Sequence, residues 1–352
     1  TLKEMSASAN LRKLSTDNDS LKKQPLFEVS KQSVHNKLNP FDALPMQRAY
    51  WMGQMFVQAA ERDGASNSEE AERLYSPHIY MEYEVVNSVK ELLRFQEIAE
   101  KTIEVLLKRH ETLHAVMTPD GQMKVLSVND CVKNGFHKIK VINASPKDLD
   151  THRQNLREDM IKNGPNTLKG PLFEVKLSVC NEERNGHEIP WGVFHISISL
   201  FVMDGRTERL LRNEVSNIFL SLWANNTSIE DLVAPYVHRL SFRDYAVASS
   251  QITNSNEYKN ASIYWESRLP TLPSPPDIPL LNPDVISSNI VHYGGSLDIR
   301  HWEKLKRLAS DIGTTTTVFL CAVYAVTLSR FSSRSNMLLN VMHTLRHDVH
   351  PD

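Results

Sequence analysis

The feature that most constrains the fold is a strand, turn and helix between residues 194 and 222. From Phe194 to Val202 the sequence alternates, so two kinds of side chain occupy the two faces of a strand. One face carries Phe194, Ile196, Ile198, Leu200 and Val202, and the other carries His195, Ser197, Ser199 and Phe201. Asp204 and Gly205 end the strand, and an amphipathic helix follows with its apolar stripe at Leu211, Val215, Ile218 and Leu222. Polar groups are therefore predicted along one side of a central strand.

Further strands and helices alternate irregularly along the chain. Strands are predicted over 80–85, 123–128 and 172–179, and a helix with apolar positions from Leu92 to His110 follows the first of them. Toward the C-terminus, the pattern predicts a strand near 292–299, helices over 302–312 and 315–331, and a strand over 337–345. No repeat and no glycine-rich phosphate loop is present. The fold class is therefore α+β or mixed α/β.

Composition divides the chain into four parts. At 352 residues with 41% hydrophobic side chains, the sequence is long enough for two packed lobes. Residues 1–39 are polar and lack an apolar stripe, so they are predicted to form a linker. Five prolines between residues 271 and 283 deny the backbone donors that a helix or central strand requires. We therefore expect a first lobe over 40–270, a crossover over 271–283 and the start of a second lobe over 284–352.

Charge and cysteine content exclude several classes of protein. A formal net charge of −2 without a run of like charge argues against a nucleic-acid partner. The three cysteines are widely spaced and odd in number, which argues against disulfides and metal motifs and favours a reducing cytoplasm. The apolar stretch from Val318 to Phe331 is too short for a membrane span and is interpreted as a buried core helix. Because residue 1 is not Met and no signal-like start follows, we expect the chain to be excised from a longer polypeptide.

Several motifs, in order and over residues 40–352, resemble the heterocyclization (Cy) subfamily of nonribosomal peptide synthetase condensation domains. Residues 44–53 (LPMQRAYWMG) resemble the "LT-x-x-Q-x-A-Y-x-x-G" signature, and residues 109–114 (RHETLH) resemble "RH-x-x-LR". The hairpin 119–122, the "FRDY" of 242–245, the "YW-x-x-RL" of 264–269 and the block 346–352 (RHDVHPD) are also similar to subfamily motifs. The later "GDF" segment is absent, so the second lobe is expected to be incomplete.

The resemblance implies a fold and a reaction. Two lobes, each like chloramphenicol acetyltransferase, would form a V-shaped pseudo-dimer around a tunnel. Carrier-protein domains would deliver substrates on phosphopantetheine arms, with neighbouring synthetase domains as partners and no directly bound cofactor, metal, nucleic acid or membrane. The domain would join an acyl group to Cys, Ser or Thr and cyclodehydrate the product to a thiazoline or oxazoline. Siderophore biosynthesis is a common setting of this family.

The same resemblance assigns candidate site residues. Ordinary condensation domains carry HHxxxDG at the turn and the heterocyclization type carries DxxxxD, whereas this chain has SLFVMDG over residues 199–205. Ser199 is therefore the degenerate motif position, and Leu200 replaces the usual catalytic His. Asp204 is the remaining carboxylate and is expected to form an inter-lobe ion pair with Arg346. His195, on the polar face of the strand, is a weak candidate base. Candidates for the tunnel lining are Tyr50, Trp51, Ser197 and Met342.

Three readings stay open at this stage. The domain could condense and cyclize, with activity impaired by Ser199 in place of Asp. It could be a degenerate copy that only condenses or only docks carrier proteins. A stand-alone acyltransferase would need HxxxD at the turn, which Leu200 denies. The sequence does not specify the acyl donor, the amino-acid acceptor, the ring, a tandem partner domain, the residues beyond Asp352 or the final product.

Overall fold

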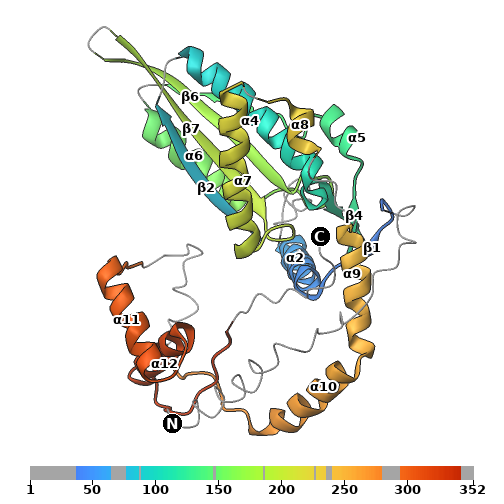
Figure 1. Ribbon diagram of the computed structural model, residues 1–352, viewed down its shortest axis with the longest axis vertical. Helices are drawn as coiled ribbons and strands as arrows, with labels where there is room; N and C mark the ends of the chain where they lie inside the picture. The colour runs from blue at the N-terminus through green and yellow to red at the C-terminus, as the bar shows by residue number, and fades with distance from the viewer. Residues whose placement is uncertain are drawn as a thin grey trace. The chain divides into compact units, whose positions relative to one another are not determined.

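The computed structural model describes residues 37–64, 77–86, 89–145, 148–184, 187–225, 227–234, 240–279 and 294–341 (Figure 1). These residues divide into two compact units, whose boundary lies between Thr253 and Asn254. The predicted linker falls almost entirely outside the described residues. The described part of the proline-rich tract, 271–279, lies within the second unit, so the boundary of the units precedes the expected crossover. The division into two lobes over 40–270 and 284–352 stays a prediction.

A four-stranded sheet organises the first unit. Its order is β2 (His78–Val86), β7 (His187–Ser199), β6 (Phe173–Arg184) and β5 (Lys140–Asn143). β7 runs antiparallel to both of its neighbours, and β5 pairs parallel to β6. The alternating segments of the sequence therefore become strands, as predicted. The register pairs Tyr80 with Ser197 and Glu82 with His195, so the polar positions of β2 and β7 share one face of the sheet.

Helices cover both faces of this sheet (Figure 1). α4 (Val89–Arg109) and α7 (Gly205–Trp223) pack on the apolar face, and both confirm helices that were predicted from their apolar stripes. Their core includes Val105, Leu106, Phe173, Leu211 and Ile218. α6 (Leu149–Lys162) covers the polar face. It carries only one buried apolar residue, Met160, so its attachment to the sheet depends on polar contacts.

A second, three-stranded sheet lies in the same unit. Its order is β1 (Phe41–Asp42), β4 (Gln122–Val125) and β3 (Ala115–Met117). Its residues share a core with α2 (Pro45–Gly64) and α9 (Phe242–Ser250). The first unit also contains the short elements η2 (Glu111–His114), α5 (Val128–Lys133) and α8 (Ile229–Val233). The short helix η4 (Gln251–Asn254) crosses the boundary between the two units. The Trp51 ring lies against Gly121, where a Cβ would come within 2.7 Å of it, and the backbone φ of +83° also favours glycine there.

The second unit is helical in its described part. It contains α10 (Asn256–Arg268), η5 (Leu269–Thr271), α11 (Ile299–Asp311) and α12 (Thr316–Ser329). The predicted helices near 302–312 and 315–331 are confirmed, but residues 294–298 and 337–341 form no strand. Instead, the Leu338 amide donates to the Ser274 carbonyl at 3.0 Å and the Ser333 hydroxyl bonds to Asp277, which ties the proline-rich segment to the chain after α12.

The interpretation of α12 as a buried core helix is wrong for the described structure. None of its described side chains is buried, and Tyr324 is 60% exposed, because α11 is the only described helix that packs extensively against it. Across the described ranges, no single helix is long and apolar enough to cross a membrane, although α11 and α12 together meet that test across a 96° bend.

Candidate functional site

The candidate site is the turn from Ser199 to Gly205, which joins β7 to α7. Ser199 is the last residue of β7, and its hydroxyl accepts a hydrogen bond from the Phe201 amide at 3.2 Å. The Leu200 amide donates to the Pro77 carbonyl at 2.7 Å, and the Gln47 side chain donates to the Phe201 carbonyl at 2.6 Å. The turn is therefore fixed by backbone contacts to the segment before β2 and to α2.

Asp204 is the N-cap of α7. Its carboxylate accepts a hydrogen bond from the Thr207 amide at 2.7 Å, which satisfies one of the free N–H groups at the start of the helix. The negative charge also interacts favourably with the positive end of the helix dipole. The sequence places Asp204 at the end of the strand, whereas the strand ends at Ser199 and Asp204 lies at the start of α7. Arg346 lies outside the described residues, so the inter-lobe ion pair stays a prediction.

The middle of the turn is apolar and packed. Phe201 and Val202 belong to the core that includes Trp51, and the Tyr50 and Phe201 rings meet edge to face at 5.9 Å. Trp51 is 7% exposed, so it is a core residue in this unit. Tyr50 is half-buried and packs against the same core. Met342 lies outside the described residues, so its place in a tunnel lining stays a prediction.

The polar face of β7 is sealed. His195, Ser197 and Ser199 have no exposed surface, because α6 covers this side of the sheet. The expectation that this face borders open space finds no support in the described residues. Ser197 is fully buried on the polar face, and its hydroxyl has no hydrogen-bond partner among the described groups.

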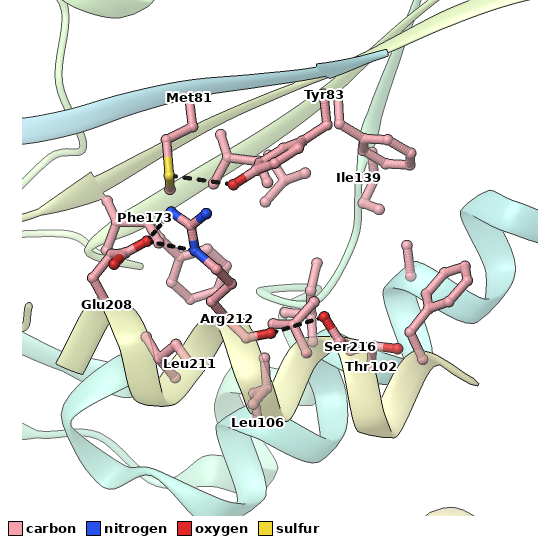
Figure 2. A pocket seen from close by; sticks show the side chains of 18 of the residues that line it. Met81, Tyr83, Thr102, Leu106, Ile139, Phe173, Glu208, Leu211, Arg212 and Ser216 are labelled. Atoms are coloured by element: carbon pink, nitrogen blue, oxygen red, sulfur yellow. Dashed lines mark hydrogen bonds and ion pairs between the residues drawn. The ribbon is translucent and has the colours of Figure 1, made fainter. Parts of the chain in front are cut away.

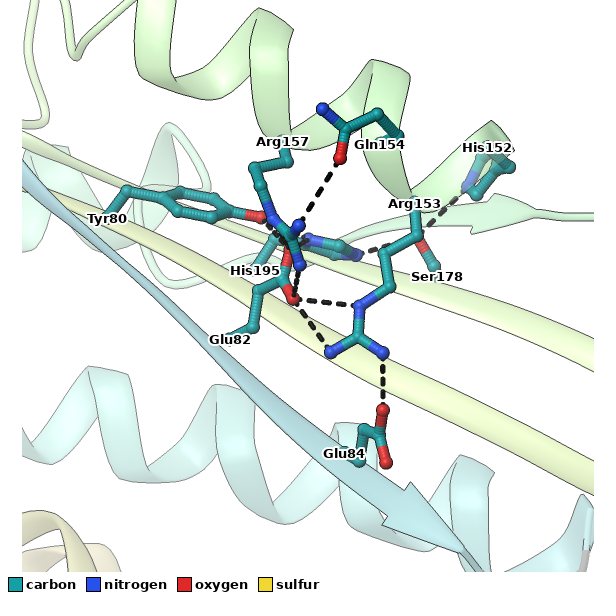
Figure 3. Close-up of polar contacts among 9 residues, drawn as sticks. All are labelled: Tyr80, Glu82, Glu84, His152, Arg153, Gln154, Arg157, Ser178 and His195. Atoms are coloured by element: carbon teal, nitrogen blue, oxygen red, sulfur yellow. Dashed lines mark hydrogen bonds and ion pairs between the residues drawn. The ribbon is translucent and has the colours of Figure 1, made fainter. Parts of the chain in front are cut away.

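His195 instead belongs to a buried polar cluster that fastens α6 to the sheet (Figure 3). Glu82 is its centre: Arg157 donates to both carboxylate oxygens, at 2.9 and 2.6 Å, and Arg153 donates to Oε2 at 2.8 Å. The Tyr80 hydroxyl donates to Glu82 Oε1 at 2.7 Å and also lies 2.7 Å from His195 Nδ1. Two arginines of a polar helix therefore bond to one carboxylate of the sheet's edge strand.

The hydrogen bonds assign the state of His195. The single hydroxyl proton of Tyr80 is donated to Glu82, so His195 Nδ1 carries a proton and donates to the Tyr80 oxygen. In a neutral ring Nε2 accepts from the Ser178 hydroxyl at 3.0 Å, and the Ser178 oxygen also lies 3.1 Å from His152 Nε2. Both ring nitrogens are occupied within a neutral imidazole.

Burial and the main neighbouring charged group act in opposite directions on the pKa of His195 and on that of Glu82. Burial lowers the pKa of His195 to about 4, even though the nearby Glu82 carboxylate favours the protonated ring. Burial acts to raise the pKa of Glu82, but hydrogen bonds from Arg157, Tyr80 and Arg153 outweigh it and lower that pKa to about 2. A neutral, enclosed His195 with both nitrogens bonded is suited to holding structure, so the geometry does not favour it as a base.

The histidine-rich motif at 109–114 is also structural. Glu214 of α7 accepts from Arg109 at 3.3 Å and contacts His110 Nε2 at 2.8 Å, which joins α4 to α7. Arg109 also donates to the Leu232 carbonyl, which attaches α8. His114 is buried, and its Nδ1 lies 2.7 Å from the Leu126 carbonyl oxygen. The "FRDY" motif starts α9, where Ser241 and Asp244 form a capping box.

Across the described ranges, no three His, Cys, Asp or Glu side chains lie close enough together to hold a metal ion. The sequence did not reveal Tyr80, Glu82, Arg153 and Arg157 as a cluster. A signal was present in the spacing of the two arginines, since residues four apart share one face of a helix.

The described residues form a mixed α/β fold, and the comparison with known families adds an identification. The family model described as "Condensation domain" matches residues 72–350. The chain therefore belongs to the condensation domain family of nonribosomal peptide synthetases.

Individual relatives are distant. Phenyloxazoline synthase MbtB of Mycolicibacterium paratuberculosis is 26% identical over 329 residues, which is 89% of this chain and 24% of that protein. The EpoB cyclization-docking bidomain from Sorangium cellulosum has a TM-score of 0.64 at 20% identity, over 93% of this chain and 57% of that one. The complex of the X-domain and OxyB from teicoplanin biosynthesis has a TM-score of 0.54 at 13% identity, over 88% and 60%. The chain spans about a quarter or less of the curated relatives that it matches.

Proposed function

We propose that this chain is part of a heterocyclization-type condensation domain whose turn at 199–205 supplies no general base at the motif position. The observation that carries the proposal is the turn itself. Ser199 is enclosed and bonded to the backbone, Leu200 is apolar, and the Asp204 carboxylate caps α7. The heterocyclization subtype rests on the motifs at 44–53, 109–114 and 242–245.

The chemistry explains why this difference matters. Amide formation needs an amine held against a thioester carbonyl, and positioning alone contributes several orders of magnitude in rate. Ring closure and loss of water both move protons, and a placed acid or base adds roughly a hundred- to ten-thousand-fold. Ser199 does not titrate near neutral pH. The turn therefore supports condensation better than cyclodehydration, unless Asp204 or residues outside this chain provide the proton transfers.

The substrates and partners follow from this proposal. Carrier-protein domains would bring an acyl donor and a Cys, Ser or Thr acceptor on phosphopantetheine arms, and the ring would be a thiazoline or oxazoline. The chain would work in the cytoplasm beside neighbouring synthetase domains, in siderophore assembly or a related pathway. Asp204 and Arg346 would pair across two lobes like chloramphenicol acetyltransferase, as the motif resemblance implies.

The test is a reaction with loaded carriers. The full-length synthetase that contains this chain is supplied with acyl- and aminoacyl-loaded carrier proteins, and linear amide and heterocycle are separated by mass, since the ring is one water lighter. The linear amide should predominate, and Ser199→Ala should leave the ratio unchanged. Efficient heterocycle formation that collapses in Ser199→Ala would show that the serine takes part in the chemistry and would overturn the proposal.

A second candidate is a docking module without catalysis of its own, and the apolar Leu200 at the usual His position favours it. The X-domain fold found in a complex with OxyB gives a structural parallel for a domain that binds another protein. This candidate predicts neither amide nor ring in the same assay while carrier binding persists. A stand-alone acyltransferase is disfavoured because the turn holds no histidine.

A further inference from the structure

The apolar face of the four-stranded sheet contains an open cavity. A space of about 550 Å³ lies between the sheet and helices α4 and α7 (Figure 2). Its walls are almost entirely apolar and include Phe95, Ile103, Val175, Ile196, Ile198 and Phe219. All of its lining residues belong to the first unit.

The size and exposure of this space distinguish it from ordinary core packing. Protein interiors are close-packed and hold few voids larger than a water molecule. Here Ile196 and Ile198, in the middle of a covered sheet, remain partly exposed, whereas the alternate residues of the same strand have no exposed surface. The volume falls within the range of small-molecule pockets, roughly 300–1,000 Å³. The cavity is therefore suited to an apolar ligand.

Polar groups gather at one side of the cavity, between β2 and α7. Arg212 donates through Nε to Glu208 Oε1 at 2.9 Å, and a second nitrogen, Nη2, contacts the same oxygen. The Arg212 side chain is 62% exposed. Tyr83 is 44% exposed, and its hydroxyl contacts only the weak acceptor Sδ of Met81, at 3.7 Å, within the described residues. Figure 2 shows these side chains at the border of the apolar space.

The charges at this border of the cavity determine which polar group an apolar ligand can carry. Glu208 compensates Arg212, so the border offers donors without net charge, and a free carboxylate would meet the Glu208 carboxylate nearby. An uncharged carbonyl instead accepts from Arg212 or Tyr83 without this repulsion. The pocket therefore matches an apolar tail that ends in a neutral carbonyl group.

Part of the cavity wall adjoins the motif turn. Ile198 immediately precedes Ser199, and Met203 immediately precedes Asp204, and both line the cavity. We propose that this cavity binds the apolar acyl group of a carrier-borne thioester, with the acyl carbonyl bonded at Arg212 and Tyr83. The thioester source rests on the function proposed above, whereas binding of a neutral acyl group does not.

The experiment measures binding alone, so its failure is distinct from failure of the reaction assay. Isothermal titration of the full chain would use N-(2-acetamidoethyl)octanamide, an uncleavable amide in place of the thioester. Octanoate tests the charge of the head group, and N-(2-acetamidoethyl)acetamide tests the tail. Two variants narrow the cavity from partly exposed positions, Val215→Trp and Leu220→Trp, and Arg212→Gln removes a donor. Arg209→Gln is the matched control on the same helix outside the cavity.

We expect the octanamide to bind saturably, and at least tenfold more tightly than octanoate or the acetamide. Val215→Trp or Leu220→Trp should weaken its binding at least tenfold, Arg212→Gln about threefold to tenfold, and Arg209→Gln less than twofold. Circular dichroism identifies any variant that does not fold, and the remaining tryptophan variant then carries the comparison. The proposal is overturned if no saturable binding occurs, if neither folded tryptophan variant weakens it, or if octanoate binds as well as the amide.

Discussion

The two faces of the four-stranded sheet differ in a way that inverts the usual expectation. On the polar face, His195, Ser197 and Ser199 are fully enclosed beneath α6. On the apolar face, Ile196 and Ile198 of the same strand border an open cavity beneath α4 and α7. On the polar face, ion pairs and hydrogen bonds attach α6 to the sheet. On the apolar face, a cavity remains between the sheet and helices α4 and α7. The polar positions of a strand pattern therefore do not identify which face of this sheet binds the ligand.

The largest loss of stability is expected when the polar cluster that attaches α6 to the sheet is disrupted. Glu82→Gln removes the charge that Arg153 and Arg157 share, and its side chain is only 10% exposed. Breaking a buried pair costs roughly 3–5 kcal/mol, and the partial exposure of the arginines reduces this to about 2–4 kcal/mol. Urea unfolding would measure the change in the free energy of unfolding.

Glu84→Gln is the matched control for this prediction. Glu84 contacts Arg153 from the same strand but is 50% exposed, so its loss should cost less than about 1 kcal/mol. Equal losses for Glu82→Gln and Glu84→Gln would mean that the cluster does not seal the polar face.

The pH dependence of stability is the next effect. Because the pKa of His195 is lowered to about 4 in the folded state, the unfolded chain binds its proton first as pH falls. The neutral His195 therefore contributes fully to the free energy of unfolding above pH 6.5, and this contribution is lost as pH falls toward 4. The expected loss between pH 7 and 5 is roughly 2 kcal/mol. In His195→Gln this part of the pH profile should be flatter, as measured by urea unfolding at each pH.

An exposed histidine provides the reference for that profile. His301 is 70% exposed on α11, so His301→Gln should change the difference in stability between pH 7 and 5 much less than His195→Gln does. A His195→Gln profile with the same slope as the wild type would show that the ring is already accessible to protons, and the polar face would not be sealed.

The sequence predicts the strand, turn and helix because periodicity and capping are local signals. The alternation of residues 194–199 and the Asp204–Gly205 step suffice to place β7 and the start of α7. The strand ends at Ser199 rather than Val202, because the chain turns there and buries Phe201 and Val202 in a different core. That change of partner depends on residues distant in sequence.

The sealing helix and the cavity could not be predicted in this way. α6 has almost no apolar stripe, since it attaches through Arg153 and Arg157 to a carboxylate about 70 residues earlier. A cavity is a property of packing, so residues such as Ile198 and Phe219 read as ordinary core positions in the sequence. The expectation that Ser197 borders a tunnel failed to find support for the same reason: alternation separates two faces but does not say what covers each.

A smaller loss of stability is expected from changes at the N-terminus of α7. Asp204→Ala removes the side-chain cap and should cost about 1 kcal/mol. Asp204→Asn keeps a capping oxygen, so a cap alone predicts a loss of only a few tenths of a kcal/mol. Any larger loss reports on the charge, and Arg346→Ala should then reproduce it if the predicted ion pair forms. Thermal unfolding of the three variants separates these roles.

The smallest effect is expected from Ser197→Ala. The hydroxyl is buried with no hydrogen-bond partner in the described part of the chain, so its removal relieves a desolvation cost. Stability should change by no more than about 0.5 kcal/mol, and turnover with loaded carriers should be unchanged. A marked loss of turnover at unchanged stability would place Ser197 against substrate and would contradict the sealed polar face.

Photoaffinity labelling tests most directly the claim that the ligand binds on the apolar face of the four-stranded sheet. An octanamide with a diazirine at the end of its tail is irradiated with the full chain, and the labelled peptides are mapped by mass spectrometry with unlabelled octanamide as competitor. The account predicts competable labels on the cavity walls, at Phe95, Ile196 and Phe219, and none on α6. Competable labels on α6 or at Ser197, or no competable label at all, would contradict it.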